Sequence, residues 1–144
     1  MAAALPDGLY SKEVDVYFKS LHGTLNHLLT ADRIWMHRLE GKGQSPDRLN
    51  AIIHDDLESL RETRVAEDQR IATFVDSLEP PDLEKSLDYK SLQGTPRRNF
   101  VRDILAHMFN HQTHHRGQAH AALTALGVKE PEPLDLLIML DEKR

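Results

Sequence analysis

The stretch His107-Met108-Phe109-Asn110-His111-Gln112-Thr113-His114-His115-Arg116-Gly117-Gln118 contains four of the nine histidines of the chain, at separations of three, four and seven residues. Side chains at these separations lie on one face of a helix. Neutral imidazole is the commonest protein ligand for a transition metal, and two histidines at i and i+4 can bind one ion from a single helix. The stretch therefore predicts a helix with a metal site on one face.

The spacing alone leaves the ligand pair open. The pairs 107/111 and 111/115 are both i,i+4, and the pairs 107/114 and 111/114 also lie close in helical phase, so His111 belongs to most combinations. A single helix rarely supplies a third ligand at good geometry, so we look for one on a facing helix. His27 is the best candidate because it lies in the largely apolar turn Leu25-Asn26-His27-Leu28-Leu29, and three imidazoles would leave coordination positions open for water or substrate.

Hydrophobic periodicity predicts three long amphipathic helices. The first covers about residues 19–39 and ends at Gly41, and the second opens at Ser45-Pro46-Asp47 and ends before Pro80-Pro81. The third begins after Asn99 as its N-cap, carries the histidine stretch and ends at Gly127. Short connections between such helices favour an all-α, up-and-down bundle in a single domain over residues 1–144.

The remaining segments are shorter. Residues 83–98 contain Gly94-Thr95-Pro96 and favour an extended excursion or loose hairpin over a helix. Residues 134–140 can form a short closing helix, and residues 9–18 can form another or lead directly into the first long one.

Composition excludes several kinds of site. The chain has no cysteine, which rules out thiolate zinc sites, iron–sulfur clusters and a cysteine nucleophile, so any metal must be bound by nitrogen and oxygen. A net charge of −5 with no basic stripe argues against nucleic-acid binding. No apolar run approaches the roughly 20 residues that span a bilayer, and no signal peptide is evident, so the expected location is the cytoplasm.

Two blocks of sequence resemble the signature blocks of the DinB/YfiT-like family of metalloenzymes. The first is Gly23-Thr24-Leu25-Asn26-His27-Leu28-Leu29-Thr30-Ala31-Asp32-Arg33-Ile34-Trp35, and the second is Asn110-His111-Gln112-Thr113-His114-His115-Arg116-Gly117-Gln118. The resemblance implies a four-helix bundle, often dimeric, that binds nickel or zinc. One ligand comes from the second bundle helix and an HxxxH pair from the last long helix.

Transferred to this chain, the ligands implied by the resemblance are His27, His111 and His115, and the resemblance leaves His107 and His114 with packing roles or contacts to ligands. Only 22 residues precede Gly23, so the first bundle helix is expected to be short or missing. We then expect the exposed apolar face to be covered by a partner subunit or by residues 9–18.

Some relatives are thiol-dependent transferases or hydrolases, so the resemblance favours a metal-dependent reaction on a small molecule with a low-molecular-weight thiol. The alternative is a non-enzymatic metal-binding bundle of a stress or damage response. Asp32 and Gln118 are candidates to orient ligands through hydrogen bonds, and Arg116 is a candidate to bind an anionic substrate group.

Overall fold

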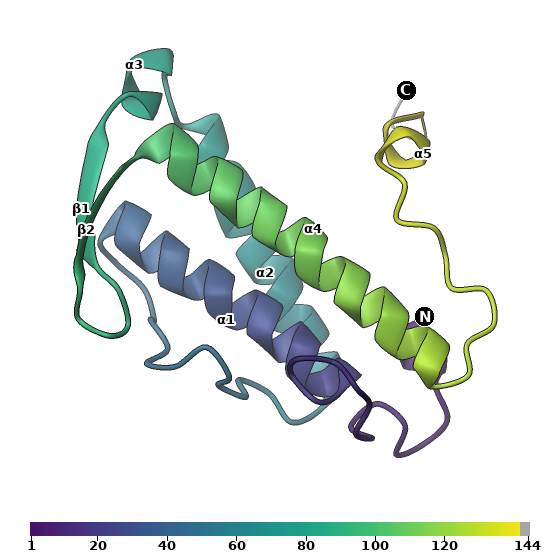
Figure 1. The fold of residues 1–144 in the computed structure, drawn as a ribbon. Coiled ribbons are helices and arrows are strands. Elements are labelled where there is room, and N and C mark those ends of the chain that lie inside the picture. The colour runs from purple at the N-terminus through teal and green to yellow at the C-terminus, as the bar shows by residue number, and fades with distance from the viewer. Residues whose placement is uncertain (142–144) are drawn as a thin grey trace.

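The computed structural model describes residues 1–141, in which three long helices form the body of the protein (Figure 1). They are α1 (Leu21–Glu40), α2 (Leu57–Asp76) and α4 (Val101–Ala125). Shorter elements are η1 (Ala2–Ala4), α3 (Pro80–Leu83), β1 (Ser86–Lys90), β2 (Pro96–Phe100) and α5 (Leu136–Asp141). The fold is thus mostly helical, with one small antiparallel sheet formed by β1 and β2.

The first and third predicted helices are confirmed with close boundaries. Ser20 caps α1 by accepting a hydrogen bond from the Gly23 amide, and Gly41 ends α1 in the left-handed region at φ 69°. The expected Asn99 cap of α4 is wrong: Asn99 lies in β2, where its side chain accepts a hydrogen bond from Tyr89, and Phe100 occupies the N-cap position.

The predicted start of the second helix is also wrong. Helix α2 begins only at Leu57, where the Asp56 side chain accepts a hydrogen bond from the Ser59 amide. Residues 41–56 instead form an irregular segment that returns along α1 (Figure 1). Side chains of α1 hold this segment by its backbone: Asn26 accepts from the amides of Ile53 and His54, and Thr30 donates to the carbonyl of Ala51.

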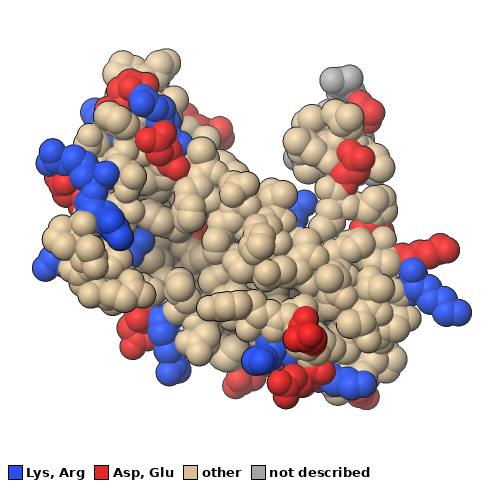
Figure 2. All heavy atoms as spheres, in the orientation of Figure 1, with Lys and Arg blue, Asp and Glu red and all other residues tan. Residues whose placement is uncertain are grey.

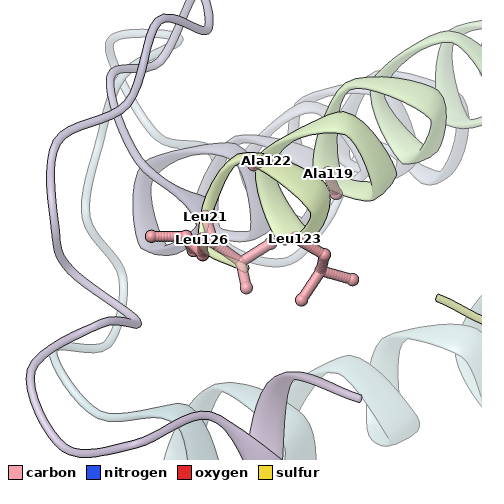
Figure 3. Packing of buried hydrophobic residues seen from close by; sticks show 5 residues of the cluster. All are labelled: Leu21, Ala119, Ala122, Leu123 and Leu126. Atoms are coloured by element: carbon pink, nitrogen blue, oxygen red, sulfur yellow. The ribbon is translucent and has the colours of Figure 1, made fainter. Parts of the chain in front are cut away.

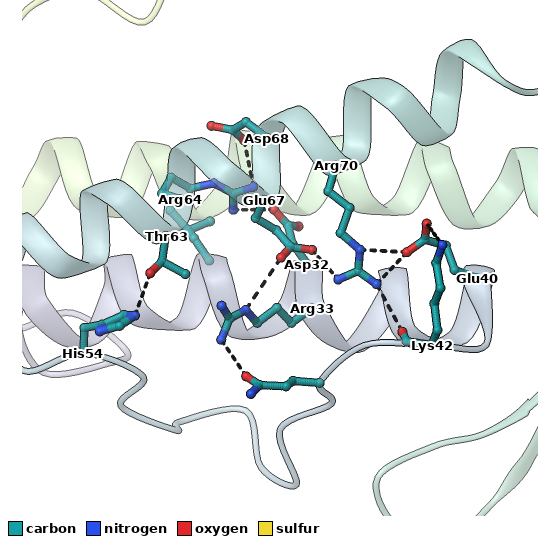
Figure 4. A network of polar contacts seen from close by, with 12 residues as sticks. Asp32, Arg33, Glu40, Lys42, His54, Thr63, Arg64, Glu67, Asp68 and Arg70 are labelled. Carbon is teal, nitrogen blue, oxygen red and sulfur yellow. Dashed lines mark hydrogen bonds and ion pairs between the residues drawn. The ribbon is translucent and has the colours of Figure 1, made fainter.

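This return makes α1 and α2 parallel, contrary to the expected up-and-down order. Three ion pairs follow both helices in the same direction: Asp32 with Arg64 at 2.6 Å, Arg33 with Glu67 at 3.6 Å and Glu40 with Arg70 at 2.6 Å (Figure 4). The α1–α2 contact is therefore largely polar. Asp32 also accepts from Gln112 of α4 at 2.6 Å, so one buried carboxylate connects all three long helices.

The apolar core is divided into two clusters. One lies where α1 begins and α4 ends, and comprises Leu21, Ala119, Ala122, Leu123 and Leu126 (Figure 3). The other lies near the opposite ends of these helices, around Met36, Ile71, Ile104, Leu105 and Met108. Between the clusters, α1 and α4 carry polar residues at the middle of their contact.

A fourth long helix is not found in residues 1–141. Residues 1–20 contain only η1 and turns, so of the two expectations for residues 9–18 the second holds: they lead into α1 without forming a helix. Their apolar side chains, including Leu9, Tyr10, Val14 and Val16, nevertheless pack against the first cluster. The N-terminal segment therefore covers part of the face that a further helix would cover.

The expected hairpin and closing helix are both present. β1 pairs with β2 over residues 86–90 and 96–100, beside one end of α1 and α4. Helix α5 stands apart from the body of the protein and buries none of its residues (Figure 1). Within residues 1–141, no helix has both the length and the apolar character needed to cross a bilayer.

Candidate metal centre

Three histidines converge between the two apolar clusters. His27 lies in the second turn of α1, and His111 and His115 lie one turn apart on α4. Nε2 of His27 is 3.1 Å from Nε2 of His111 and 3.2 Å from Nε2 of His115. His27 and His115 are buried, and His111 is half-buried.

Hydrogen bonds at the other ring nitrogens fix the tautomers. Nδ1 of His27 donates to the Leu49 carbonyl at 2.8 Å, and Nδ1 of His115 donates to Oε1 of Gln118 at 2.8 Å. A neutral imidazole that donates from Nδ1 has a lone pair at Nε2. These two histidines therefore direct lone pairs toward each other and toward Nε2 of His111.

The rings are held neutral. Burial, opposed in part by the hydrogen bond to Leu49, lowers the pKa of His27 from 6.5 to about 4. Burial, reinforced by the neighbouring histidines, likewise lowers the pKa of His111 to about 4, and burial also lowers the pKa of His115. At neutral pH the three rings are thus uncharged, and the only ring N–H left to face the converging lone pairs of His27 and His115 is the single proton of His111.

This arrangement fits a divalent cation. Two imidazole nitrogens bound at about 2.0–2.1 Å to one tetrahedral ion lie about 3.3 Å apart, close to the separations from His27. The ligand atoms of these three histidines lie within 4.8 Å of one another, and among residues 1–141 no further histidine, aspartate or glutamate joins them. A site with three protein ligands leaves coordination positions for water or substrate.

Phe18 closes one side of the cluster. Its ring stacks on His27 with centroids 3.8 Å apart and meets His115 edge-on at 5.5 Å. The close approach requires a glycine on α1, because a Cβ at Gly23 would lie 2.2 Å from the Phe18 carbonyl oxygen. The Gly23 position in the first sequence block thus has a packing role beside the site.

The other predicted site residues lie in different surroundings. Gln118 contacts His115 and, through Nε2, donates to exposed His114. His107 lies edge-on to Trp35, with its ring 5.8 Å from that of His111. None of these three belongs to the group of close ligand atoms.

Asp32 and Arg116 are not placed beside the ligands. Asp32 contacts Arg64 and Gln112, so it acts on the helix packing; burial raises its pKa even though Arg64 lies 2.6 Å away. Arg116 is exposed on another face of α4, near residues 132–136. The expected anion-binding role of Arg116 at this site does not fit its position.

Two features of the site were not predicted from the sequence. The Leu49 carbonyl that orients His27 lies in a segment predicted to be helical, and Phe18 lies in a segment whose path the sequence left open. The polar residues Asn26 and Thr30 provided a signal, because buried polar side chains on either side of His27 require partners from another segment.

Comparison with known proteins assigns the chain to a family. The sequence profile of the DinB family matches residues 1–143. The chain belongs to the DinB family. It is also similar to Protein DinB of Bacillus subtilis (strain 168), with 27% identity over 129 residues that cover 85% of this chain and 74% of the relative. No solved structure matches significantly. Family membership and the histidine cluster both fit metal binding in this DinB protein.

Proposed function

We propose that this DinB protein binds one divalent ion, zinc or nickel, through His27, His111 and His115, and uses it in a transferase or hydrolase reaction on a small molecule. A low-molecular-weight thiol is the proposed co-substrate. The observation that carries the proposal is the convergence of three neutral imidazoles, two of them oriented by hydrogen bonds at Nδ1. Imidazole accepts several divalent ions, so availability in the cell selects among them.

An ion bound by three neutral ligands keeps its charge of +2 uncompensated, which acidifies a bound water or thiol and polarises a carbonyl. The protein residues contribute orientation and exclusion of water. Leu49 and Gln118 hold His27 and His115, and Phe18 covers the buried side. On another side, a cavity of about 330 Å³ is lined by His111 and gives room for a small substrate.

This cavity favours an enzyme over the alternative, a non-enzymatic metal-binding bundle of a stress response. A structural metal site is normally closed by a fourth protein ligand, and the cluster in residues 1–141 has three. The proposal is tested by loading the protein with one equivalent of zinc or nickel. The loaded protein is then incubated with glutathione and 1-chloro-2,4-dinitrobenzene, or with 4-nitrophenyl acetate alone.

In the first assay the thiolate sulfur forms a bond to the aromatic carbon and chloride leaves; in the second, water cleaves the ester. We expect a metal-dependent rate in at least one assay, lost in His111→Ala and kept in His114→Ala. Metal binding without any rate above the metal-free protein would favour the non-enzymatic alternative.

We also propose that the protein forms a homodimer through α5. Five consecutive apolar residues, Leu136 to Leu140, are 38–69% exposed, and the helix stands away from the body of the protein (Figure 1). An exposed apolar patch of this kind is typical of an interaction surface. A second copy of the chain offers the same surface in a symmetric contact.

A further inference from the structure

The cavity beside His111 is lined by apolar side chains and two arginines, whereas the metal centre consists of histidines. It lies between α1, α4 and the β1–β2 hairpin, and His107 and His111 form its border toward the metal centre. Ile34, Trp35 and Leu92 contribute apolar surface to its wall. The cavity can therefore bind a partly apolar small molecule, one end of which lies near the proposed metal ligands.

Two arginines line this cavity, and none of its lining residues is acidic. The Arg38 guanidinium lies 4.6 Å from the Trp35 ring centroid and 4.7 Å from that of Tyr89, and it donates to the Lys90 carbonyl at 3.0 Å. These contacts fix its position with a backbone carbonyl and two ring faces, and leave its charge unpaired by any carboxylate of the cavity.

The register of the hairpin places Arg97 on the face of the sheet that carries Tyr89 and lines the cavity. Arg97 is directly opposite Tyr89, and both line the cavity. The next residue, Arg98, is opposite Asp88 on the other face and forms a two-bond ion pair with it at 2.7 Å. Adjacent arginines thus differ: one is neutralised by a carboxylate, and the other faces the cavity.

This local charge stands out because the chain has a net charge of −5. Figure 2 shows basic and acidic side chains together at the hairpin end of the molecule, at the left, and a largely uncharged surface over the middle of the same face. An anionic small molecule would be repelled by the protein as a whole and attracted at this place. Guanidinium groups bind carboxylates through paired, charge-assisted hydrogen bonds.

We propose that this cavity binds a small carboxylate with a planar apolar body. Arg38 and Arg97 bind the carboxylate, Trp35 contacts the body, and the opposite end of the molecule lies toward His111. The inference rests on the proposed function for the role of that end, and it names the substrate class of the site. It also transfers to Arg38 and Arg97 the anion-binding role that the sequence suggested for Arg116.

The test uses 4-fluorobenzoate and its neutral isostere 4-fluorobenzamide, titrated against the full-length protein and followed by fluorine NMR. Proton NMR of the same samples follows the protein. Trp35 is the only tryptophan of the chain, so its single indole N–H signal reports whether the probe enters this cavity. We expect the benzoate to bind about tenfold more tightly than the amide, as for a hydrogen bond to a charged group, and to shift the Trp35 signal.

Arg97→Gln should weaken benzoate binding about tenfold and reduce the preference over the amide to the part that Arg38 supplies. Arg98→Gln is the matched control and should leave both unchanged, because that side chain faces away from the cavity. Equal binding of the two probes, equal losses in the two variants, or an unmoved Trp35 signal would overturn the proposal.

A final comparison separates this inference from metal binding. In His111→Ala, whose metal content is measured independently, the benzoate should still bind more tightly than the amide through Arg97. Loss of the preference in that variant would show that the metal centre, and not the arginines, holds the carboxylate.

Discussion

Gln118 shows how one residue outside the ligand set can act on the site. Its Oε1 accepts from Nδ1 of His115 and so directs the lone pair of Nε2 toward the other histidines. Removing such a partner typically costs 10–100-fold in metal affinity. We therefore expect Gln118→Leu to weaken zinc binding by about that factor, measured by competition with a chromophoric chelator.

Arg116→Gln is the control for this prediction, since Arg116 is exposed on the same helix but away from the cluster. Equal affinities of Gln118→Leu and wild type would contradict the role of Gln118.

The histidines also predict a pH dependence of stability. In the unfolded metal-free chain His27 and His111 titrate near 6.5, and in the folded protein near 4. Between these values the unfolded state binds more protons, so the free energy of unfolding should fall as pH falls from about 6.5 to about 4. Above about pH 6.5 both histidines are neutral in the folded and the unfolded chain, so no stability is lost to their protonation.

Urea unfolding of metal-free protein across this pH range measures the effect. His111→Gln should have a shallower slope than wild type, and exposed His114→Gln should keep the full slope. A wild-type midpoint that does not change between pH 7 and pH 4 would rule out this account of the buried histidines.

At the scale of elements, the N-terminal segment reaches the site through Gly23. Gly23→Ala places a methyl group against the Phe18 carbonyl, which must move and carry the Phe18 ring off His27. Such overpacking typically costs 1–3 kcal/mol, so we expect a loss of about 2 kcal/mol in the free energy of unfolding. Chemical denaturation measures it.

Gly117→Ala is the matched control on α4, because open space surrounds that position and alanine favours a helix. It should stabilise the protein by about 0.5–1 kcal/mol. A Gly23→Ala variant as stable as wild type would show that Phe18 is not held against α1.

The same scale explains which elements the sequence predicted. Helices α1 and α4 have long apolar stripes. Gly41 is the C-cap of α1, and Gly127 directly follows the C-cap of α4, so local signals suffice to predict both helices. Residues 45–56 also have local helix signals, Ser45-Pro46-Asp47 followed by Leu49 and Ile53. Their backbone groups instead bond to side chains of α1, and these non-local contacts determine the path of the segment.

The candidate site divides in the same way. Helical spacing indicated His111 as the common ligand, the apolar turn around His27 made it the candidate on a facing helix, and the family resemblance selected His115. The Leu49 carbonyl, Phe18 and Arg97 could not be inferred, because each lies in a segment whose position depends on tertiary contacts. Arg38 lies on the predicted helix α1, but its place in the cavity depends on the hairpin that it contacts.

At the scale of the whole molecule, the exposed α5 predicts self-association. Leu137 is 69% exposed, and replacing it with glutamate should place a charge in the proposed dimer contact. Sedimentation velocity of the full chain should then show a dimer for wild type and a monomer for Leu137→Glu. Val65→Glu, at a comparably exposed apolar position on α2, should remain dimeric. A monomeric wild type at micromolar concentration would contradict the dimer.

The metal content of the protein tests the central claim most directly. The chain is purified without a nickel column, exposed to one equivalent of zinc or nickel and desalted. Its metal content per chain is then measured by inductively coupled plasma mass spectrometry. We predict about one ion per chain for wild type and for His114→Ala, and none for His111→Ala, because three converging imidazoles are needed to bind the ion. Stoichiometric metal in His111→Ala, or none in wild type, would contradict the account.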